Sequence, residues 1–279
     1  MLAEGRAFAD LSGWRKVAVE GADALRWLDA LLTADLEDLA PGRARRALLL
    51  SPTGGVRAAV TVARPEGSVL LLQDPVQARP VLELLAPYVL SSDVRLQDRT
   101  GELALLAFPG REEPPAVSGG WASAPSVLGR GVDLILPAEE RGRVLGELRG
   151  ASEEASEEDV EAWRVASGIA RFGVDGEEGD LPAECGLEDA VSFGKGCFLG
   201  QEAVAKVRNL GHPRRVLRHL EATGPVRAGE PVLADGREAG AVTSAAVRGG
   251  RWFALVRVRW EARDAPLRTA SGAELAPLG

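Results

Sequence analysis

The apolar positions of the first half of the chain change spacing several times. Between residues 21 and 32 they recur at Leu25, Leu28 and Leu31, an interval that predicts a helix. After Pro41-Gly42 the apolar residues form continuous or alternating runs, which are typical of strands. The two strands that flank the glycine-containing turn 51–55 are expected to form a hairpin. The predicted strands cover residues 47–50, 56–63, 68–73 (after a turn at 65–67), 94–99, 102–108 and 132–136.

Prolines and capping residues mark where helices should begin. Asp74 followed by Pro75 suits an N-cap and a first helical position, so we expect a helix from there to about residue 85. Pro137 is expected to open a helix to about residue 148, and Ser156 to cap another. Residues 109–125 are rich in proline, glycine and serine and are expected to form a loop. Helices and strands alternate irregularly, which favours an α+β fold.

From about residue 214 the pattern contains strands alone. Apolar stretches alternate with short glycine-containing turns, which is the pattern of a small antiparallel β-barrel. The predicted strands cover residues 216–220, 231–233, 241–247 and 252–260. We therefore expect an α+β domain of residues 1–210, built of two lobes, and a C-terminal barrel domain of residues 211–279.

Composition places the chain among ordinary globular proteins. Of its 279 residues 46% are hydrophobic, and no apolar run approaches the roughly 20 residues of a membrane span. The N-terminal residues lack the pattern of a signal peptide. Cys185 and Cys197 make neither a disulfide framework nor a full metal set, and His212 and His219 lie at no metal-ligand spacing and are expected at the surface. We expect a cytoplasmic protein with reduced thiols, no bound metal and no membrane contact.

The net charge of −8 is unevenly distributed. Residues 203–279 contain 13 basic and 7 acidic residues, whereas residues 1–202 carry a net charge of −14. A basic C-terminal barrel is compatible with binding of RNA, and equally with arginines that are merely solvated on strand faces. Aromatic residues do not alternate with the basic ones as a surface for single-stranded nucleic acid requires.

The most informative segment is Lys195-Gly196-Cys197-Phe198-Leu199-Gly200-Gln201-Glu202. Its glycines permit a sharp turn or a close approach to a ligand, and a helix is expected to start at Gly200. A thiol just ahead of a helix and near an ammonium is expected to be more reactive. Because the chain has three lysines against 30 arginines, Lys195 is a candidate stabiliser of the Cys197 thiolate. The alternative is that Cys197 is a buried structural thiol in a tight turn.

This octapeptide resembles the K-G-C-[FY]-x-G-Q-E signature of the YgfZ family, a folate-binding branch related to the glycine-cleavage T-protein, an aminomethyltransferase. The resemblance extends over about residues 11–260. Its weaker parts are an entry helix at 21–35 and the strand Gly240-Ala241-Val242-Thr243-Ser244, which resembles the family's G-x-V-T-S strand. The resemblance implies T-protein-like folate-binding α+β lobes followed by the barrel, with tetrahydrofolate as the cofactor.

A second stretch of the resemblance concerns the folate. Arg171-Phe172-Gly173 together with residues 181–187 resembles the T-protein stretch R-x-G … P-x-E-x-G-L, whose glutamate faces the pterin ring. A carboxylate suits a pterin because it accepts hydrogen bonds from an amine and a ring N–H side by side. The resemblance implies Glu184 for this role and, from the segment that enters the barrel, Arg215 rather than Arg214 for the folate carboxylates. The expected folate-binding set also includes Gly196, Gly200, Gln201 and Glu202 of the signature.

One departure from the T-protein pattern bears on activity. Aminomethyltransferases carry acidic residues on the strand after the Gly-Gly turn, whereas residues 56–60 here are Val-Arg-Ala-Ala-Val. General acid–base assistance from that strand is absent, so glycine cleavage is disfavoured. The YgfZ resemblance implies a tetrahydrofolate-dependent accessory role for iron–sulfur enzymes or cluster-assembly proteins, including enzymes that modify tRNA, with Cys197 and Lys195 as the working residues. A folate-dependent one-carbon transferase and a module that binds tRNA through its barrel are the alternatives.

Overall fold

The computed structural model describes the chain except for residues 1, 66–67, 91, 116, 118–119 and 279. Part of the turn expected at 65–67 and part of the loop expected at 109–125 lie outside the described residues. The chain forms two compact units. Unit 1 consists of Met1–Ser51, Arg57–Ser156 and Ala190–Leu199, and unit 2 of Pro52–Val56, Glu157–Asp189 and Gly200–Gly279. The expected domain boundary at residue 210 stays a prediction.

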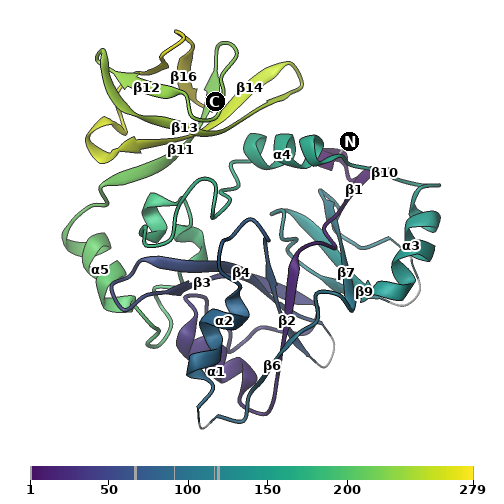
Figure 1. The fold of residues 1–279 in the computed structure, drawn as a ribbon. Helices are drawn as coiled ribbons and strands as arrows, with labels where there is room; N and C mark the ends of the chain where they lie inside the picture. Colours follow the sequence, from purple (N-terminus) through teal and green to yellow (C-terminus); the bar gives the residue numbers. More distant parts are fainter. Residues whose placement is uncertain (1, 66–67, 91, 116, 118–119, 279) are drawn as a thin grey trace. The chain divides into compact units, whose positions relative to one another are not determined.

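Unit 1 contains two five-stranded sheets, of which the first has the strand order β3-β4-β5-β2-β6. Helices α1 and α2 pack on the same face of this sheet, where Leu28 and Leu84 join alternate residues of the strands in one apolar core (Figure 1). The predicted first helix and the predicted hairpin are confirmed. The elements are β2 (Arg15–Glu20), α1 (Ala24–Leu31), β3 (Arg43–Leu50), β4 (Val56–Arg64), β5 (Val69–Gln73), α2 (Val81–Leu85) and β6 (Arg95–Asp98).

The second sheet of unit 1 has the strand order β10-β1-β7-β9-β8. Helix α3 packs against it, and the rings of Phe8 and Phe108 lie 5.9 Å apart in the shared core. Strand β8 falls within the loop expected at 109–125, because three residues are too few to show strand alternation in the sequence. The elements are β1 (Ala7–Asp10), β7 (Leu103–Pro109), β8 (Trp121–Ser123), β9 (Gly131–Pro137), α3 (Arg141–Leu148) and β10 (Glu153–Glu154).

The helix expected from Asp74 is wrong in its starting point, because α2 begins only at Val81. The Asp74 carboxylate accepts a hydrogen bond from the Val76 N–H (2.9 Å), which closes a local turn instead of capping a helix. The Gln77 amide then donates to the Ala59 carbonyl of β4 (2.7 Å) and accepts from the Ala59 N–H (3.0 Å). A long-range contact of one glutamine therefore outweighs the local helix signal.

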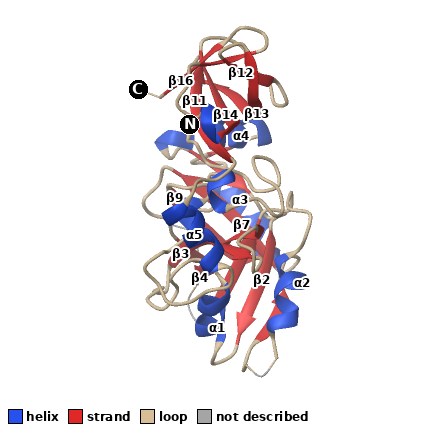
Figure 2. Cartoon of the chain, turned by 90° about the vertical axis from the view of Figure 1, so that its left-hand side faces the viewer, coloured by secondary structure: helices blue, strands red, loops and turns tan. Residues whose placement is uncertain are grey.

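Unit 2 is built around a closed six-stranded barrel with the order β11-β14-β13-β12-β15-β16 (Figure 2). Its strand pairs are antiparallel, and Leu220, Val242 and Val256 are among the side chains that fill the interior. The four predicted barrel strands are confirmed, and two short strands that the sequence did not reveal complete the closure. The strands are β11 (Arg215–Ala222), β12 (Pro231–Ala234), β13 (Arg237–Arg248), β14 (Arg251–Arg259), β15 (Leu267–Thr269) and β16 (Glu274–Pro277).

The described residues of unit 2 also form two α-helices, α4 (Glu157–Ala166) and α5 (Gln201–Leu210). The helix expected after Ser156 is confirmed as α4. Its residue Val165 forms a small apolar core with Phe253 and Leu255 of the barrel, which fixes α4 on the outside of β14. Within the described ranges, no helix has the length and apolar character needed to cross a membrane.

A buried carboxyl group in the second sheet of unit 1 predicts a pH-dependent stability. Asp133 of β9 is fully buried and accepts hydrogen bonds from the Ser126 hydroxyl and the Val127 N–H (2.8 Å). Burial outweighs these hydrogen bonds and raises the pKa of Asp133 to about 7. The folded state thus holds this proton more tightly than the unfolded chain, and the resulting stabilisation is lost as the pH rises from about 4 to 7.

The substitution Asp133→Asn removes the titrating group while it keeps the shape of the side chain. We expect the free energy of unfolding of the variant to rise relative to wild type as the pH is raised between about 4 and 7. Chemical denaturation of both proteins at several pH values measures this difference. A difference that stays constant over the whole range would show that Asp133 titrates like an ordinary exposed carboxyl group.

Candidate functional site

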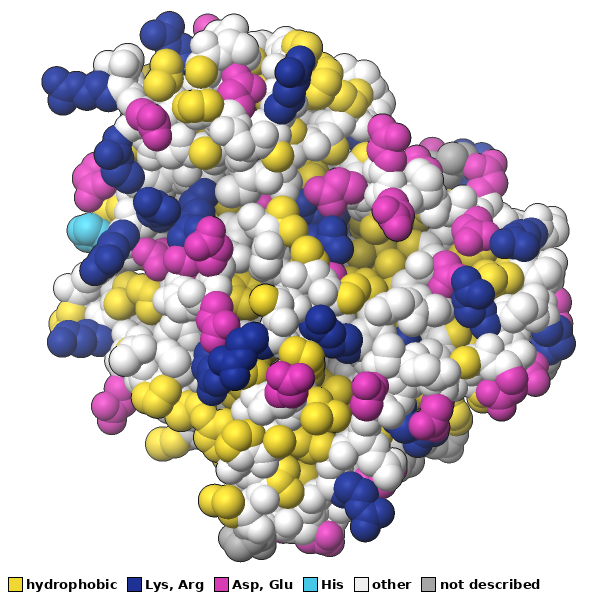
Figure 3. Space-filling view, viewed as in Figure 1, with side chains coloured by type: hydrophobic (Ala, Val, Ile, Leu, Met, Phe, Trp, Pro, Cys, Tyr) yellow, Lys and Arg dark blue, Asp and Glu magenta, His cyan; other side chains and the backbone are white. Residues whose placement is uncertain are grey.

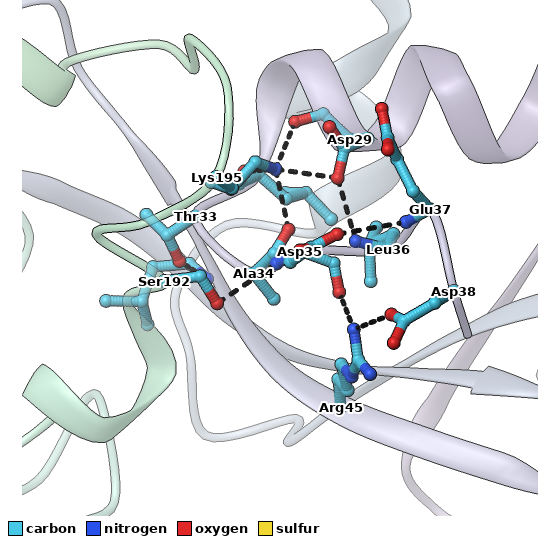
Figure 4. A network of polar contacts seen from close by, with 12 residues as sticks. Asp29, Thr33, Ala34, Asp35, Leu36, Glu37, Asp38, Arg45, Ser192 and Lys195 are labelled. Atoms are coloured by element: carbon cyan, nitrogen blue, oxygen red, sulfur yellow. Dashed lines mark hydrogen bonds and ion pairs between the residues drawn. The ribbon is translucent and has the colours of Figure 1, made fainter.

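The signature segment is held in unit 1 by residues that lie far away in the sequence. The Thr33 hydroxyl donates to the Ala190 carbonyl (2.6 Å), and the Ser192 N–H donates to the Thr33 carbonyl (2.9 Å). The Ser192 hydroxyl in turn accepts a hydrogen bond from the Asp35 N–H (3.1 Å; Figure 4). These contacts place the chain before Lys195 along the turn that follows α1.

The Lys195 ammonium lies at the C-terminal end of α1 (Figure 4). Its Nζ atom contacts Asp29 Oδ1 (2.8 Å) and the carbonyl oxygens of Asp29 (2.6 Å), Ala34 (2.7 Å) and Leu32 (3.1 Å), and its side chain is 1% exposed. The last carbonyls of a helix carry partial negative charge, so an ammonium is favourable there. Four oxygens share three ammonium hydrogens, so the contacts of Lys195 are with the helix end instead of the Cys197 thiol, for which the sequence suggested it.

Cys197 is exposed, so the alternative of a buried structural thiol is wrong for this residue. The next residue, Phe198, is buried, and Leu199 packs against the main core of unit 1. The buried thiol of the chain is Cys185, and burial raises its pKa to about 12. Cys197 is therefore the thiol that reagents and partners in solution can reach.

The end of the signature begins α5, as predicted. Gly200 is the N-cap with a φ of 80°, in the left-handed region that favours glycine. Gln201 is the first helical residue, and Glu202 is exposed in the first turn, where a carboxylate is favourable. Gly196 differs: it has no φ in the left-handed region, and a Cβ at this position would find no atom within 4 Å. The fold itself therefore requires glycine at Gly200 but not at Gly196.

Three segments of the T-protein resemblance meet in unit 2. The glycine turn of residues 52–56 lies against residue 179, whose N–H donates to the Val56 carbonyl (2.9 Å). A Cβ at Gly55 would lie 2.6 Å from the carbonyl oxygen of Gly179, and one at Gly54 would lie 2.9 Å from the Cβ of Ala203 in α5. The glycine pair thus permits close packing of this turn against both the 179–187 segment and the start of α5.

Glu184 ends the short 3-10 helix Pro182–Glu184 and is 8% exposed. Its carboxylate accepts hydrogen bonds from the Leu181 N–H and the Arg214 N–H (3.0 Å each), so it joins its own segment to the entrance of β11. Sequence reasoning missed this structural contact. Each carboxylate oxygen can accept two hydrogen bonds and uses one here, which leaves acceptor capacity for a ligand.

Arg215 is the first residue of β11 and is exposed. In the antiparallel register it lies directly opposite Arg259 of β14, an arrangement in which like charges repel. The described part of the chain offers neither arginine an ion-pair partner, whereas Arg257, two residues before Arg259, pairs with Asp180 (2.5 Å). The entrance of the barrel thus presents two uncompensated guanidinium groups that suit an anionic ligand.

Asp175 is a buried carboxylate that the sequence did not single out. It accepts hydrogen bonds from Arg164 Nη1 (2.7 Å), the Arg171 N–H (2.9 Å) and the hydroxyls of Thr243 and Ser244 (2.6 Å each). It therefore joins α4, the loop after α4 and β13. The resemblance drew attention to Thr243 and Ser244 of the G-x-V-T-S strand. Their partner Asp175, however, is one of seven acidic residues between 171 and 195, and no local pattern distinguishes it from the others.

The histidines and the basic residues of the barrel give little sign of a further site. His212 is exposed and stacks on Trp260 (5.1 Å between ring centroids), whereas His219 is half-buried, contrary to expectation, and burial lowers its pKa. On the face shown in Figure 3, basic side chains are interspersed with acidic ones. Over the described residues there is no cluster of three or more His, Cys, Asp or Glu side chains suited to a metal ion. Direct binding of tRNA stays a prediction.

A solved structure shares the fold. The structure superimposes on the crystal structure of glycine cleavage system aminomethyltransferase T from Bartonella henselae with a TM-score of 0.80, covering 98% of this chain and 86% of that one at 21% sequence identity. The expected T-protein-like α+β fold with a C-terminal barrel is therefore confirmed.

Sequence comparison gives the family. The aminomethyltransferase of Rubrobacter xylanophilus is 30% identical over 264 residues, with 84% of this chain and 70% of the relative covered. That of Streptomyces coelicolor is 27% identical over 272 residues (85% and 73% covered), and a putative chloroplastic transferase of Arabidopsis thaliana is 23% identical over 269 residues (86% and 62%). The GCVT N-terminal domain matches residues 2–113. This chain belongs to the aminomethyltransferase (GCVT) family.

Proposed function

We propose that this chain binds tetrahydrofolate or one of its one-carbon derivatives. Membership of the aminomethyltransferase family carries the proposal, because the relatives match over more than four fifths of the chain. The segment around Glu184, which resembles the pterin-binding stretch of the T-protein, supports it further. The bound folate would supply the one-carbon chemistry, and the residues of the protein would bind and orient it.

Glu184 and Arg215 offer the two kinds of contact that a folate needs. The remaining acceptor capacity of the Glu184 carboxylate suits the adjacent amine and ring N–H of a pterin. The exposed Arg215 guanidinium suits the carboxylates at the other end of a folate, and Arg259 opposite it adds a second positive charge. The signature residues Gly196, Gly200, Gln201 and Glu202 stay candidate contacts.

One-carbon transfer is the activity that the named relatives favour. In this chain, however, β4 contains no carboxylate between Val56 and Arg64. Ala58 is fully buried in the core, and the backbone of Ala59 is occupied by the side chain of Gln77. A transferase with this sequence would have to place its general base on another segment.

A tetrahydrofolate-dependent accessory role for iron–sulfur enzymes is the activity that the signature favours. The exposed Cys197 is available to a partner protein, as such a role requires. A single thiol cannot hold a cluster, for which four protein ligands are usual, so the partner would supply the others. The proposed assignment to the YgfZ branch rests on the same segment. The comparisons with known proteins support one-carbon transfer more directly. The absence of a carboxylate from β4 and the exposed Cys197 thiol support the accessory role.

Calorimetric titration with tetrahydrofolate under anaerobic, reducing conditions tests the shared part of both activities. We expect saturable binding at one site. The substitution Glu184→Ala should weaken it by about 1.5–3 kcal/mol, the scale of a hydrogen bond to a charged group. Glu188→Ala, at an exposed acid of the same segment, is the matched control and should leave the affinity unchanged.

Because Glu184 also holds two backbone N–H groups, the free energy of unfolding of both variants should be measured in parallel. A folded Glu184→Ala protein with wild-type affinity would place the pterin elsewhere. Absence of any binding to the wild-type protein would contradict the proposed function as a whole.

A further inference from the structure

We propose that Lys195 is a positioning residue that fixes the backbone beside Cys197, so that the exposed thiol is presented from a rigid support. The inference rests on the proposed working role of Cys197. It differs from the electrostatic role that the sequence suggested, in which the ammonium would stabilise the thiolate directly. The two roles predict different behaviour when the lysine is replaced.

The contacts of the ammonium carry this inference. Four oxygen atoms within 3.1 Å surround Nζ, and they belong to Asp29, Leu32 and Ala34, at the end of α1 and just after it. Asp29 Oδ1 is itself fixed, because it also accepts a hydrogen bond from the Leu36 N–H (2.7 Å). Lys195 is therefore bound to the C-terminal end of α1, a helix that packs in the main core of unit 1.

A second anchor lies directly after the thiol. Phe198 is 7% exposed, and the Lys195 ammonium lies 5.8 Å from the centroid of its ring. Leu199 packs against the same core as α1. Two exposed residues, Gly196 and Cys197, thus stand between the buried side chains of Lys195 and Phe198, and these anchors on both sides restrict how far the thiol can move.

The glycine beside the thiol supports the same interpretation. Gly196 occupies open space and has no left-handed backbone conformation, so neither packing nor φ requires it. A glycine at this position leaves one flank of Cys197 uncovered. The segment thus combines buried side chains that fix the backbone with an exposed, unobstructed thiol. This arrangement is expected of a thiol that reacts with or binds a partner molecule.

The chain offers its own probe for this inference, since of its two thiols Cys197 is exposed and Cys185 is buried. A methanethiosulfonate nitroxide should label the native full-length protein once, at Cys197. We expect the electron paramagnetic resonance spectrum of the labelled wild type to show slow motion of the nitroxide. In Lys195→Met this slow component should be lost. Lys206→Met, at an exposed lysine of α5, is the control and should keep the wild-type spectrum.

Lys195→Met leaves the Asp29 carboxylate without its counter-ion and can fail to fold for that reason. The double variant Asp29→Asn/Lys195→Met removes both charges and keeps an acceptor for the Leu36 N–H. We expect this variant to fold and to show the same loss of the slow component. An unchanged spectrum in the folded double variant would overturn the inference.

The pH dependence of the reaction of Cys197 with a thiol reagent separates positioning from direct stabilisation. If Lys195 only positions the backbone, the pH at which the reaction of Cys197 reaches half its maximal rate should differ by less than about half a pH unit between the folded double variant and the wild type. An upward shift of about one unit or more would show that Lys195 stabilises the thiolate, contrary to the inference. Neither readout depends on folate or on an iron–sulfur partner, so a failure of the proposed function would be recognised separately.

Discussion

Replacing Asp175 with alanine should lower the free energy of unfolding by about 3–5 kcal/mol, the usual effect of removing one partner of a buried ion pair. Its side chain is fully buried, and that of its partner Arg164 is 5% exposed. The variant would leave the Arg164 guanidinium with Glu161, the Ile169 carbonyl and the Ser244 hydroxyl, and would remove the acceptor shared by Thr243 and Ser244. The contacts of α4 and of the loop after it with β13 would weaken together.

Chemical denaturation of the variant beside wild type measures this effect. Asp264→Ala is the matched control, because that carboxylate is 74% exposed and forms only surface pairs, with Arg263 (3.1 Å) and Arg218 (3.8 Å). Exposed pairs of this kind contribute little, so the control should unfold like the wild type. A loss for Asp175→Ala no larger than that of the control would mean that the hydroxyls and the arginine find new partners in the folded variant.

Under the proposed accessory role, replacing Cys197 with serine should abolish the support of iron–sulfur enzymes, while the fold and the proposed binding of tetrahydrofolate stay as in the wild type. The thiol is exposed, so serine at this position costs no packing. A hydroxyl, however, is a far weaker nucleophile and a poorer ligand for iron than a thiolate. The activity of a cluster-containing enzyme in cells whose own copy of this protein has been deleted, complemented by wild type or variant, measures the effect.

Cys185→Ala is the matched control for the thiol. It removes the buried sulfur, so some stability should be lost, but support of the iron–sulfur enzymes should persist in the folded protein. Full support from Cys197→Ser would remove the thiol from the function and favour one-carbon transfer, the activity that the relatives suggest. Loss of tetrahydrofolate binding in Cys197→Ser would instead indicate that the signature segment is part of the folate site.

Local patterns in the sequence were sufficient for much of the fold. The spacing of Leu25, Leu28 and Leu31 predicted α1, because one face of a helix must be apolar to pack on a sheet. The glycine-containing turns predicted the hairpin of β3 and β4 and four of the six barrel strands. Antiparallel strands that follow one another in the chain are joined by short turns, and glycine is common in such turns. The signature correctly predicted the start of α5 at Gly200, where the left-handed φ requires glycine.

Long-range contacts decided what these patterns could not. The Asp74-Pro75 helix signal did not prevail because Gln77 bonds to the backbone of β4, which no local window contains. Asp175 carried no signal among its acidic neighbours, and its partners are up to 69 residues away in the chain.

The sequence by itself thus determined the relationship to the T-protein, four of the six barrel strands and the identity of the candidate thiol, since each depends on motifs of residues that are near one another in the chain. Which groups each charged side chain meets was decided by the tertiary structure alone. Lys195 is two residues from Cys197 in sequence, yet its ammonium is bound by Asp29, 166 residues away. The physical reason is that a buried charge must be compensated by whatever groups the fold brings to it, and hydrogen bonds to helix-end carbonyls and a carboxylate satisfy an ammonium better than a neighbouring exposed thiol does.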